Sequence, residues 1–235
     1  MSREELRRRW KQPTSARNAY RHPREMRAKM RGMKDRWAKS SRNTAVWRIA
    51  GAYTLLVLFA GSLSFLLRDD APWVHPKPWI VMPALTATLT SALCGMATAM
   101  LIVISTRFVV GRFAWAQRLH AELRPVAQDL TVGQIFLLAG LSSLGEEVLF
   151  RGLLTPTLGV VLSSLLFGFL HQVRGPSRWV WIWWATAVGL VLGTIFAATG
   201  SLVGPLLAHA VVNAVNLGYL RDHDPDENDR QRHMV

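Results

Sequence analysis

Six long apolar runs constrain this chain more than any other feature of its sequence. A run of about 20 apolar residues, wound as an α-helix, crosses the ~30 Å hydrocarbon core of a bilayer. A helix also satisfies its backbone hydrogen bonds within itself, as a bilayer requires. The runs therefore predict an all-α fold, a polytopic transmembrane helical bundle of about six spans: 49–67, 79–106, 133–154, 157–172, 179–198 and 202–220.

Positive charge is distributed unevenly between the links that join these runs. Residues 1–48 hold 16 of the 28 Lys and Arg residues. With the N-terminus in the cytoplasm, every Lys and Arg except Arg68, Lys77 and the intramembrane Arg151 falls on the cytoplasmic side. Because Lys and Arg accumulate there in membrane proteins, we expect both termini to be cytoplasmic. The expected location is a membrane, and specifically the bacterial inner membrane.

The chain divides into four expected parts. The basic tail is predicted to lie in the cytoplasm and to contact lipid headgroups, with no nucleic acid as partner. The polar C-terminal segment is expected to be disordered. Between them lie two spans with an amphipathic link and then a core that carries the polar motifs. The parts are 1–48, 49–132, 133–220 and 221–235.

Two further features bear on local structure. Apolar side chains recur at helical spacing in the 107–124 link, at Phe108, Trp115 and Leu119. This link is therefore either an interfacial helix or an extension of the second span. The single cysteine, Cys94, lies in an apolar run, which excludes a disulfide framework and a cysteine metal cluster.

Three ionisable residues interrupt the third run: Glu146, Glu147 and Arg151. Each charge at the centre of a membrane helix costs about 2.5–3.5 kcal/mol, so retained charges indicate function. Glu147 and Arg151 are four residues apart, share one helix face and can pair. Glu146 points about 100° away. We therefore expect Arg151 to hold Glu147 and to leave Glu146 available for chemistry.

Two more polar clusters follow in later spans. They are Phe167-x-x-x-His171 and His209-x-x-x-Asn213. Taken singly, each residue has a structural interpretation: a histidine or asparagine can bond a neighbouring helix, and Phe167 can simply pack. Polar residues within spans face the bundle interior or a watery cavity. We therefore expect Glu146, His171, His209 and Asn213 to converge from three helices.

Such a set suits hydrolysis. A carboxylate in an apolar pocket can act as general base on water, and a histidine can pass the proton on. A second histidine and an amide can donate hydrogen bonds to an oxyanion. Glu146, His171 and His209 could also bind zinc and leave one position for water. The sequence lacks the H-E-x-x-H motif of zinc proteases, so zinc is possible and not required.

In their order and spacing, these motifs resemble those of the CAAX protease and bacteriocin-processing enzyme (CPBP, or Abi) family of intramembrane endopeptidases. The family pattern is EExxxR, FxxxH and HxxxN, and the resemblance covers about residues 133–220. It implies that Glu146 and His171 activate water while His209 and Asn213 stabilise the oxyanion. Glu147, Arg151 and Phe167 would support them. Members have been described as metalloproteases and as glutamate-dependent proteases, and we favour the second, with no cofactor.

The resemblance implies a membrane-associated protein or peptide as substrate, with the lipid bilayer as the other partner. Two non-enzymatic alternatives stay open. Buried carboxylates and histidines can relay protons in a transporter, although the chain shows no internal repeat of the kind transporters use. The other alternative is a self-protection or scaffold protein with the same fold.

Overall fold

The computed structural model describes residues 23–68 and 71–224. Residues 1–47 and 48–235 form two separate compact units, and the bundle described below belongs to the second. Residues 1–22 of the predicted basic tail and residues 225–235 of the predicted polar tail lie outside the described part. Residues 23–47, predicted as tail, continue into the first span as one helix.

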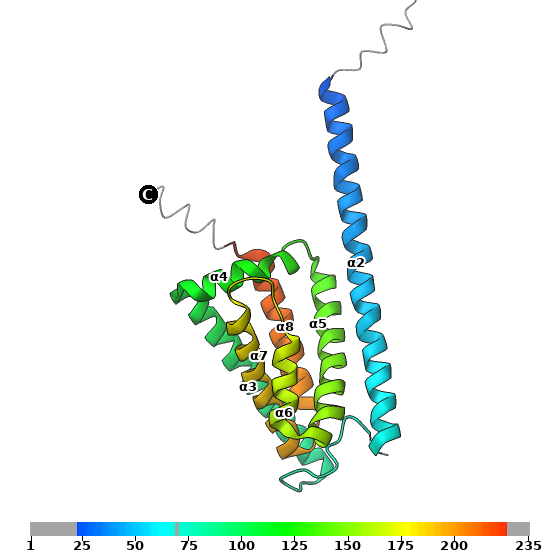
Figure 1. The fold of residues 1–235 in the computed structure, drawn as a ribbon, viewed down its shortest axis with the longest axis vertical. Helices are drawn as coiled ribbons and strands as arrows, with labels where there is room; N and C mark the ends of the chain where they lie inside the picture. The colour runs from blue at the N-terminus through cyan, green and yellow to red at the C-terminus, as the bar shows by residue number, and fades with distance from the viewer. Residues whose placement is uncertain (1–22, 69–70, 225–235) are drawn as a thin grey trace, which may run out of the picture. The chain divides into compact units, whose positions relative to one another are not determined.

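The described chain is all-α, as predicted (Figure 1). A 3₁₀ turn η1 and a π-helix η2 join the α-helices. Within the described residues, the only β contact is an isolated bridge between Val74 and Ser201. The elements in chain order are α2 (Pro23–Arg68), α3 (Ala84–Arg112), α4 (Ala114–Leu123), η1 (Arg124–Val126), α5 (Val132–Glu147), η2 (Val148–Leu154), α6 (Thr155–Leu170), α7 (Arg178–Thr199) and α8 (Val203–Asp222).

Within the described residues, five helical stretches are long and apolar enough to cross a membrane, whereas the sequence suggested about six. The difference arises at 133–154 and 157–172, which form one stretch, Val132–Leu170. This stretch folds back on itself: the rings of Phe150 and Phe167 lie 5.0 Å apart, whereas a straight helix would separate them by about 26 Å. From Gly159 to Leu170 the helix rises only about 16 Å, which is too short to cross the bilayer.

The reversal has a local cause in the sequence. Gly159 has φ +81°, a left-handed conformation that glycine adopts without strain and that breaks the helix. Pro156 has no backbone N–H and cannot donate to the carbonyl of Gly152 as a residue in a regular helix would. That carbonyl instead accepts from the guanidinium of Arg68. The hydroxyl of Thr155 donates to the carbonyl of Phe150 over 2.9 Å.

Small residues let the core helices pack at backbone distance. A Cβ at Gly95 of α3 would collide with the backbone of Gly204 in α8. The hydroxyl of Ser91 accepts from the Gly204 N–H at 3.0 Å and donates to the carbonyl of Ser201 at 2.8 Å. Small residues serve this purpose in membrane bundles, where helices cannot gain from excluding water. The start of α8 is thereby fixed against α3.

The 107–124 link contains both an extension of the second span and a separate amphipathic helix. The second span continues as α3 to Arg112, and Phe113 is extended, with φ −120° and ψ 127°. A separate amphipathic helix, α4, follows and buries Ala116 and His120 while Trp115 is exposed.

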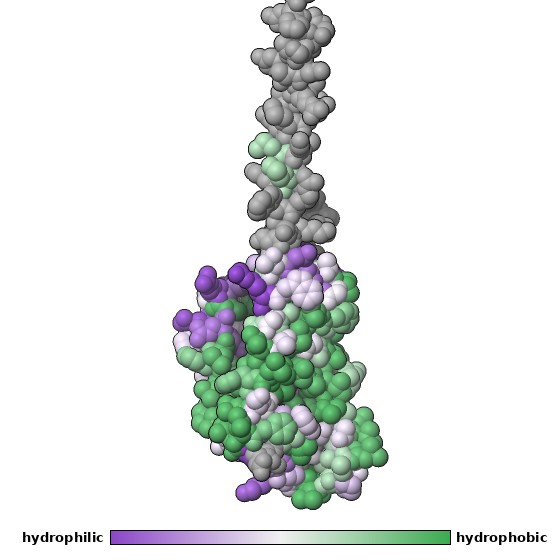
Figure 2. All heavy atoms as spheres, turned by 90° about the vertical axis from the view of Figure 1, so that its right-hand side faces the viewer, coloured by the Kyte–Doolittle hydropathy of each residue, from purple (hydrophilic) through white to green (hydrophobic). Residues whose placement is uncertain are grey.

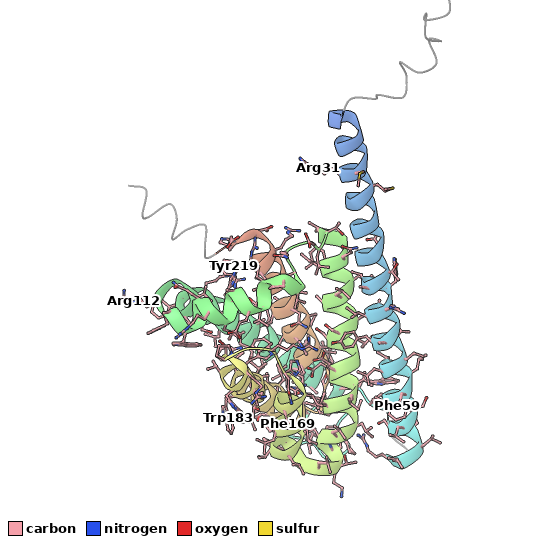
Figure 3. The ribbon with its side chains drawn as sticks, turned by 45° about the horizontal axis from the view of Figure 1, so that its top comes forward. Arg31, Phe59, Arg112, Phe169, Trp183 and Tyr219 are labelled. Carbon is pink, nitrogen blue, oxygen red and sulfur yellow. The ribbon has the colours of Figure 1, made fainter. Side chains whose placement is uncertain are left out.

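The surface of the bundle is apolar over its middle, and hydrophilic side chains gather toward its ends (Figure 2). Phe169 on α6 and Trp183 on α7 project outward from the bundle (Figure 3) and are 56% and 62% exposed. Large contiguous apolar surfaces of this kind are not tolerated in water. The arrangement is that of an integral membrane protein.

Candidate active site

Glu146 is the centre of a polar cluster near the point where α5 passes into η2. Its Oε1 accepts a hydrogen bond from the hydroxyl of Tyr53, on α2, over 2.9 Å. Its Oε2 is buried and accepts no hydrogen bond. This oxygen faces Nε2 of His171 at 3.4 Å and Nε2 of His209 at 3.7 Å. The carboxylate therefore has one anchored oxygen and one oxygen turned toward two imidazoles.

His171 lies just beyond the end of α6, with φ −84° and ψ 69°. The sequence placed it inside the span 157–172; the structure ends the helix at Leu170. Because the α6 limb is short, His171 lies beside Glu146, with Nε2 and Oε2 3.4 Å apart. Its Nδ1 lies 2.8 Å from the carbonyl of Phe167, which can only accept. Nδ1 therefore carries a proton, and Nε2 is the ring nitrogen turned toward Glu146.

The predicted Glu147–Arg151 ion pair is present, with Nη1 and Oε1 3.0 Å apart. The same oxygen of Glu147 lies 2.7 Å from Nδ1 of His209. Sequence spacing did not reveal this second contact, since it depends on how α8 lies against α5. A carboxylate on Nδ1 fixes the orientation of an imidazole, so Glu147 turns Nε2 of His209 toward Glu146.

Arg151 and Phe167 pack against the polar cluster and connect it to α7. Nη2 of Arg151 donates to the carbonyl of Gly189 on α7 over 3.3 Å. The guanidinium carbon lies 4.5 Å from the centroid of the Phe167 ring. The Phe167 ring centroid is in turn 4.2 Å from that of His171 and 5.9 Å from that of His209. Phe167 therefore packs against both imidazoles.

Asn213 lies one turn beyond His209 on α8. Its amide nitrogen donates to the hydroxyl of Ser142 over 3.2 Å and lies 3.5 Å from that of Ser143. Ser142 precedes Glu146 by one turn of α5. The structure thus joins Glu146, His171 and His209 directly and places Asn213 beside the neighbouring turn.

Sequence reasoning missed Tyr53. A single tyrosine in an apolar run belongs to no motif, and α2 lies outside the segment with family resemblance. The one available signal is the polar hydroxyl itself, a few residues inside the first span.

The donor types at the site are those that zinc accepts: one carboxylate oxygen and two imidazole nitrogens. Each histidine also holds its Nδ1 against a carbonyl or carboxylate, as metal-binding histidines do. In residues 23–68 and 71–224, however, no group of three or more His, Cys, Asp or Glu side chains is arranged to hold a metal ion. The side chains fit zinc by type and not by arrangement.

An apolar cavity of about 380 Å³ lies among α3, α4, α7 and α8. Its volume is in the range of small-molecule sites. Arg107 and Asn216 are among its few polar residues, and they bond each other over 3.0 Å. The Trp181 ring centroid is 6.4 Å from that of His171, so the cavity begins beside the polar cluster. Its aromatic lining comprises Trp115, Trp181, Trp183, Trp184 and Tyr219.

Comparison with known proteins bears on the same segment. Residues 128–215 match the family described as Rce1-like, type II CAAX prenyl endopeptidase. The chain is 36% identical over 85 residues to "Uncharacterized protein YpbD" of Bacillus subtilis (strain 168). That match covers 36% of this chain and 44% of the relative, so the chain spans less than half of the relative's length. No solved structure matches. The family resemblance predicted from the three motifs is confirmed over residues 128–215.

Proposed function

From the match of residues 128–215 to Rce1-like endopeptidases, we propose that this protein is an intramembrane endopeptidase. It hydrolyses a peptide bond in a membrane-anchored or membrane-proximal protein segment. The observation that carries the proposal is the free oxygen of Glu146 facing two imidazole nitrogens within an apolar bundle. Oε2 of Glu147 is also buried without a partner, but only Oε2 of Glu146 faces the Nε2 atoms of two imidazoles, and this arrangement supports a catalytic role.

The attacking water would lie beside Oε2 of Glu146, where it can also bond Nε2 of His171 and Nε2 of His209; these nitrogens lie 3.4 and 3.7 Å from Oε2. Glu146 takes a proton from this water while the water oxygen attacks the scissile carbonyl carbon. When the C–N bond breaks, the proton reaches the leaving amine through Nε2 of His171. The carbonyl of Phe167 keeps that nitrogen aimed at the reaction by holding Nδ1.

The oxyanion that forms on the carbonyl oxygen needs hydrogen-bond donors. We assign Nε2 of His209 as one donor, because Glu147 holds Nδ1 and turns Nε2 toward the reacting group. The amide nitrogen of Asn213 carries two N–H groups, and it donates to Ser142 over 3.2 Å and to Ser143 over 3.5 Å. We assign the N–H of the longer bond to the oxyanion once substrate is bound. This sequence of steps uses only the side chains present and requires no cofactor; zinc bound by Glu146, His171 and His209 is the competing mechanism.

The substrate is proposed to be a protein with an apolar segment in the membrane. The aromatic-lined cavity begins beside His171 and would receive apolar side chains next to the scissile bond.

The test compares Glu146→Gln with the wild type. Membranes that contain either protein at equal amounts are analysed for new peptide termini by mass spectrometry, and substrates found there are re-tested with purified protein in liposomes. Glutamine keeps an acceptor for Tyr53 and removes the base, so we expect cleavage to fall by about 10²–10⁴-fold. Glu122→Gln, at a glutamate that accepts from Ser177, is the matched control and should cleave normally.

Unchanged cleavage by Glu146→Gln would overturn the proposal. Cleavage that a chelator abolishes and zinc restores would replace the metal-free mechanism by the zinc mechanism. If wild-type membranes contain no new peptide termini, the proposal is overturned, and proton transport through Glu146 and Glu147 becomes the better hypothesis.

A further inference from the structure

We propose that Tyr53 is a positioning residue for Glu146, and that the first span is therefore part of the catalytic unit. This span lies outside residues 128–215, the segment that matches the endopeptidase family. The inference rests on the function proposed above and adds to it a residue that none of the three motifs contains.

The hydrogen bond from Tyr53 decides which oxygen of Glu146 is available. The last torsion of a glutamate side chain is broad, so the carboxylate alone would exchange its two oxygens readily. Tyr53 engages Oε1 at 2.9 Å. Oε2 is then the oxygen that faces His171 and His209. The tyrosine thus selects a single orientation of the base relative to both imidazoles.

Helix α2 approaches α5 closely at Tyr53. A Cβ at Gly145 would lie 3.2 Å from Cδ1 of Tyr53 and 3.3 Å from its carbonyl oxygen, tighter than ordinary contact. Further along the same face of α2, Ala60 and Ser64 are fully buried. By contrast, Phe59 projects away from the bundle (Figure 3) and is 60% exposed. The segment of α2 from residue 48 onward meets the bundle along one narrow face, and Tyr53 lies on it.

Adjacent carboxylates receive partners of different chemistry. Glu147 is held by the cation of Arg151, which neutralises its charge. Glu146 is held by a phenol, which orients a carboxylate and leaves its charge for proton abstraction. A cationic anchor at Glu146 would weaken it as a base. The neutral hydroxyl of Tyr53 therefore suits the role of a positioning group.

The experiment removes only this hydroxyl. In Tyr53→Phe, measured with a substrate identified as above, we expect kcat to fall about 10- to 100-fold, as for the loss of a hydrogen bond to a charged group. KM should stay within about twofold, because Tyr53 is assigned no contact with substrate. Thr54→Val is the matched control: it deletes the next hydroxyl of the helix, which bonds only the carbonyl of Ala50 at 2.9 Å, and should keep kcat.

Two further measurements separate positioning from stability. Gly145→Ala retains both the phenol and the carboxylate, but its methyl group requires Tyr53 to shift by a few tenths of an ångström, and it should lower kcat in the same direction. Thermal unfolding of Tyr53→Phe in detergent should match that of Thr54→Val. Equal loss of folded protein and of activity in Tyr53→Phe would overturn the inference in favour of a structural role.

A readout independent of activity uses a hydrophobic carbodiimide, which reacts with protonated carboxyl groups. Because the loss of the phenol frees Oε1 of Glu146 to react, Glu146 in Tyr53→Phe should be labelled faster than in the wild type, as mapped by mass spectrometry. Wild-type kcat and wild-type labelling in Tyr53→Phe would refute the proposal. Faster labelling in a protein whose cleavage does not depend on Glu146 would refute the protease function and leave the Tyr53 contact standing.

Discussion

Arg151 shows at the residue scale how a full charge is kept in an apolar bundle. Its side chain is about 1% exposed and is balanced by Glu147, itself fully buried. Replacing Arg151 by Met would leave that carboxylate without its cation. We expect a loss of about 3–5 kcal/mol in the free energy of unfolding, since a broken buried pair leaves an uncompensated charge. The double variant Glu147→Gln/Arg151→Met should lose much less than the two single losses added together.

Unfolding of the purified protein by denaturant in mixed micelles measures this cycle. Additive losses would show that the two side chains are energetically independent.

His120 provides a prediction about pH. The ring is 5% exposed, and Nε2 lies 3.0 Å from the carbonyl of His223. Burial, aided by the charges of Arg107 and Arg124, lowers the pKa of His120. When the pH falls below about 6.5, the ordinary pKa of histidine, His120 binds a proton in the unfolded chain but not in the folded chain. The contribution of neutral, buried His120 to the free energy of unfolding is therefore present at neutral pH and is lost as the pH falls.

The measurement is the denaturation midpoint between pH 7.5 and pH 5.5 for wild type and His120→Gln. The wild type should lose stability on acidification more steeply than the variant, and equal slopes would contradict the assignment. His75, whose pKa burial also lowers, is common to both proteins and cancels in the comparison.

A side-chain contact of the candidate site could be predicted from the sequence only where both residues lie on one helix. The Glu147–Arg151 pair followed from a spacing of four residues and is found. The Tyr53–Glu146 and Glu147–His209 contacts join residues 93 and 62 positions apart. Their register depends on how three helices slide and rotate against each other, which no local spacing encodes.

At the scale of elements, apolar runs identified the helices but not how one of them turns. The run through Val132–Leu170 is apolar throughout, so hydropathy alone cannot distinguish two spans from one folded stretch. The reversal depends on the left-handed Gly159 and on Pro156 near the start of α6. Both residues can be recognised in the sequence as helix breakers. The position at which α6 ends, beside Glu146, follows only from the packed structure.

The contact between α3 and α8 predicts a strong effect from a small substitution. In Gly204→Ala the added methyl group would collide with the backbone of Ser91. Overpacking of this kind costs about 1–3 kcal/mol, and more where backbone must move. Gly218→Ala, on the same helix with open space around it, should match or exceed wild-type stability. Thermal unfolding in detergent compares the two, and equal midpoints would contradict the close approach.

For the whole molecule, the charge pattern predicts a topology that accessibility can test. The exposed native cysteine is first removed by Cys94→Ala. Lys77→Cys then places a thiol in the loop before α3, and Gln128→Cys places one in the link before α5; both positions are exposed. With both termini cytoplasmic, a membrane-impermeant maleimide should label residue 77 on intact cells and residue 128 only after permeabilisation. The reverse pattern would invert the proposed orientation.

The shortness of α6 has a consequence for the surrounding lipid. Its outward face presents Val161, Leu165 and Phe169 to the acyl chains, but this apolar wall ends at Leu170, and Gln172 and Arg174 follow it. Lipids beside a wall of about 16 Å must compress or tilt to cover it, at a cost that rises with each ångström of mismatch. We therefore expect the bilayer to be thinner beside α6 than around the longer helices, so that a thin membrane accommodates the protein most easily.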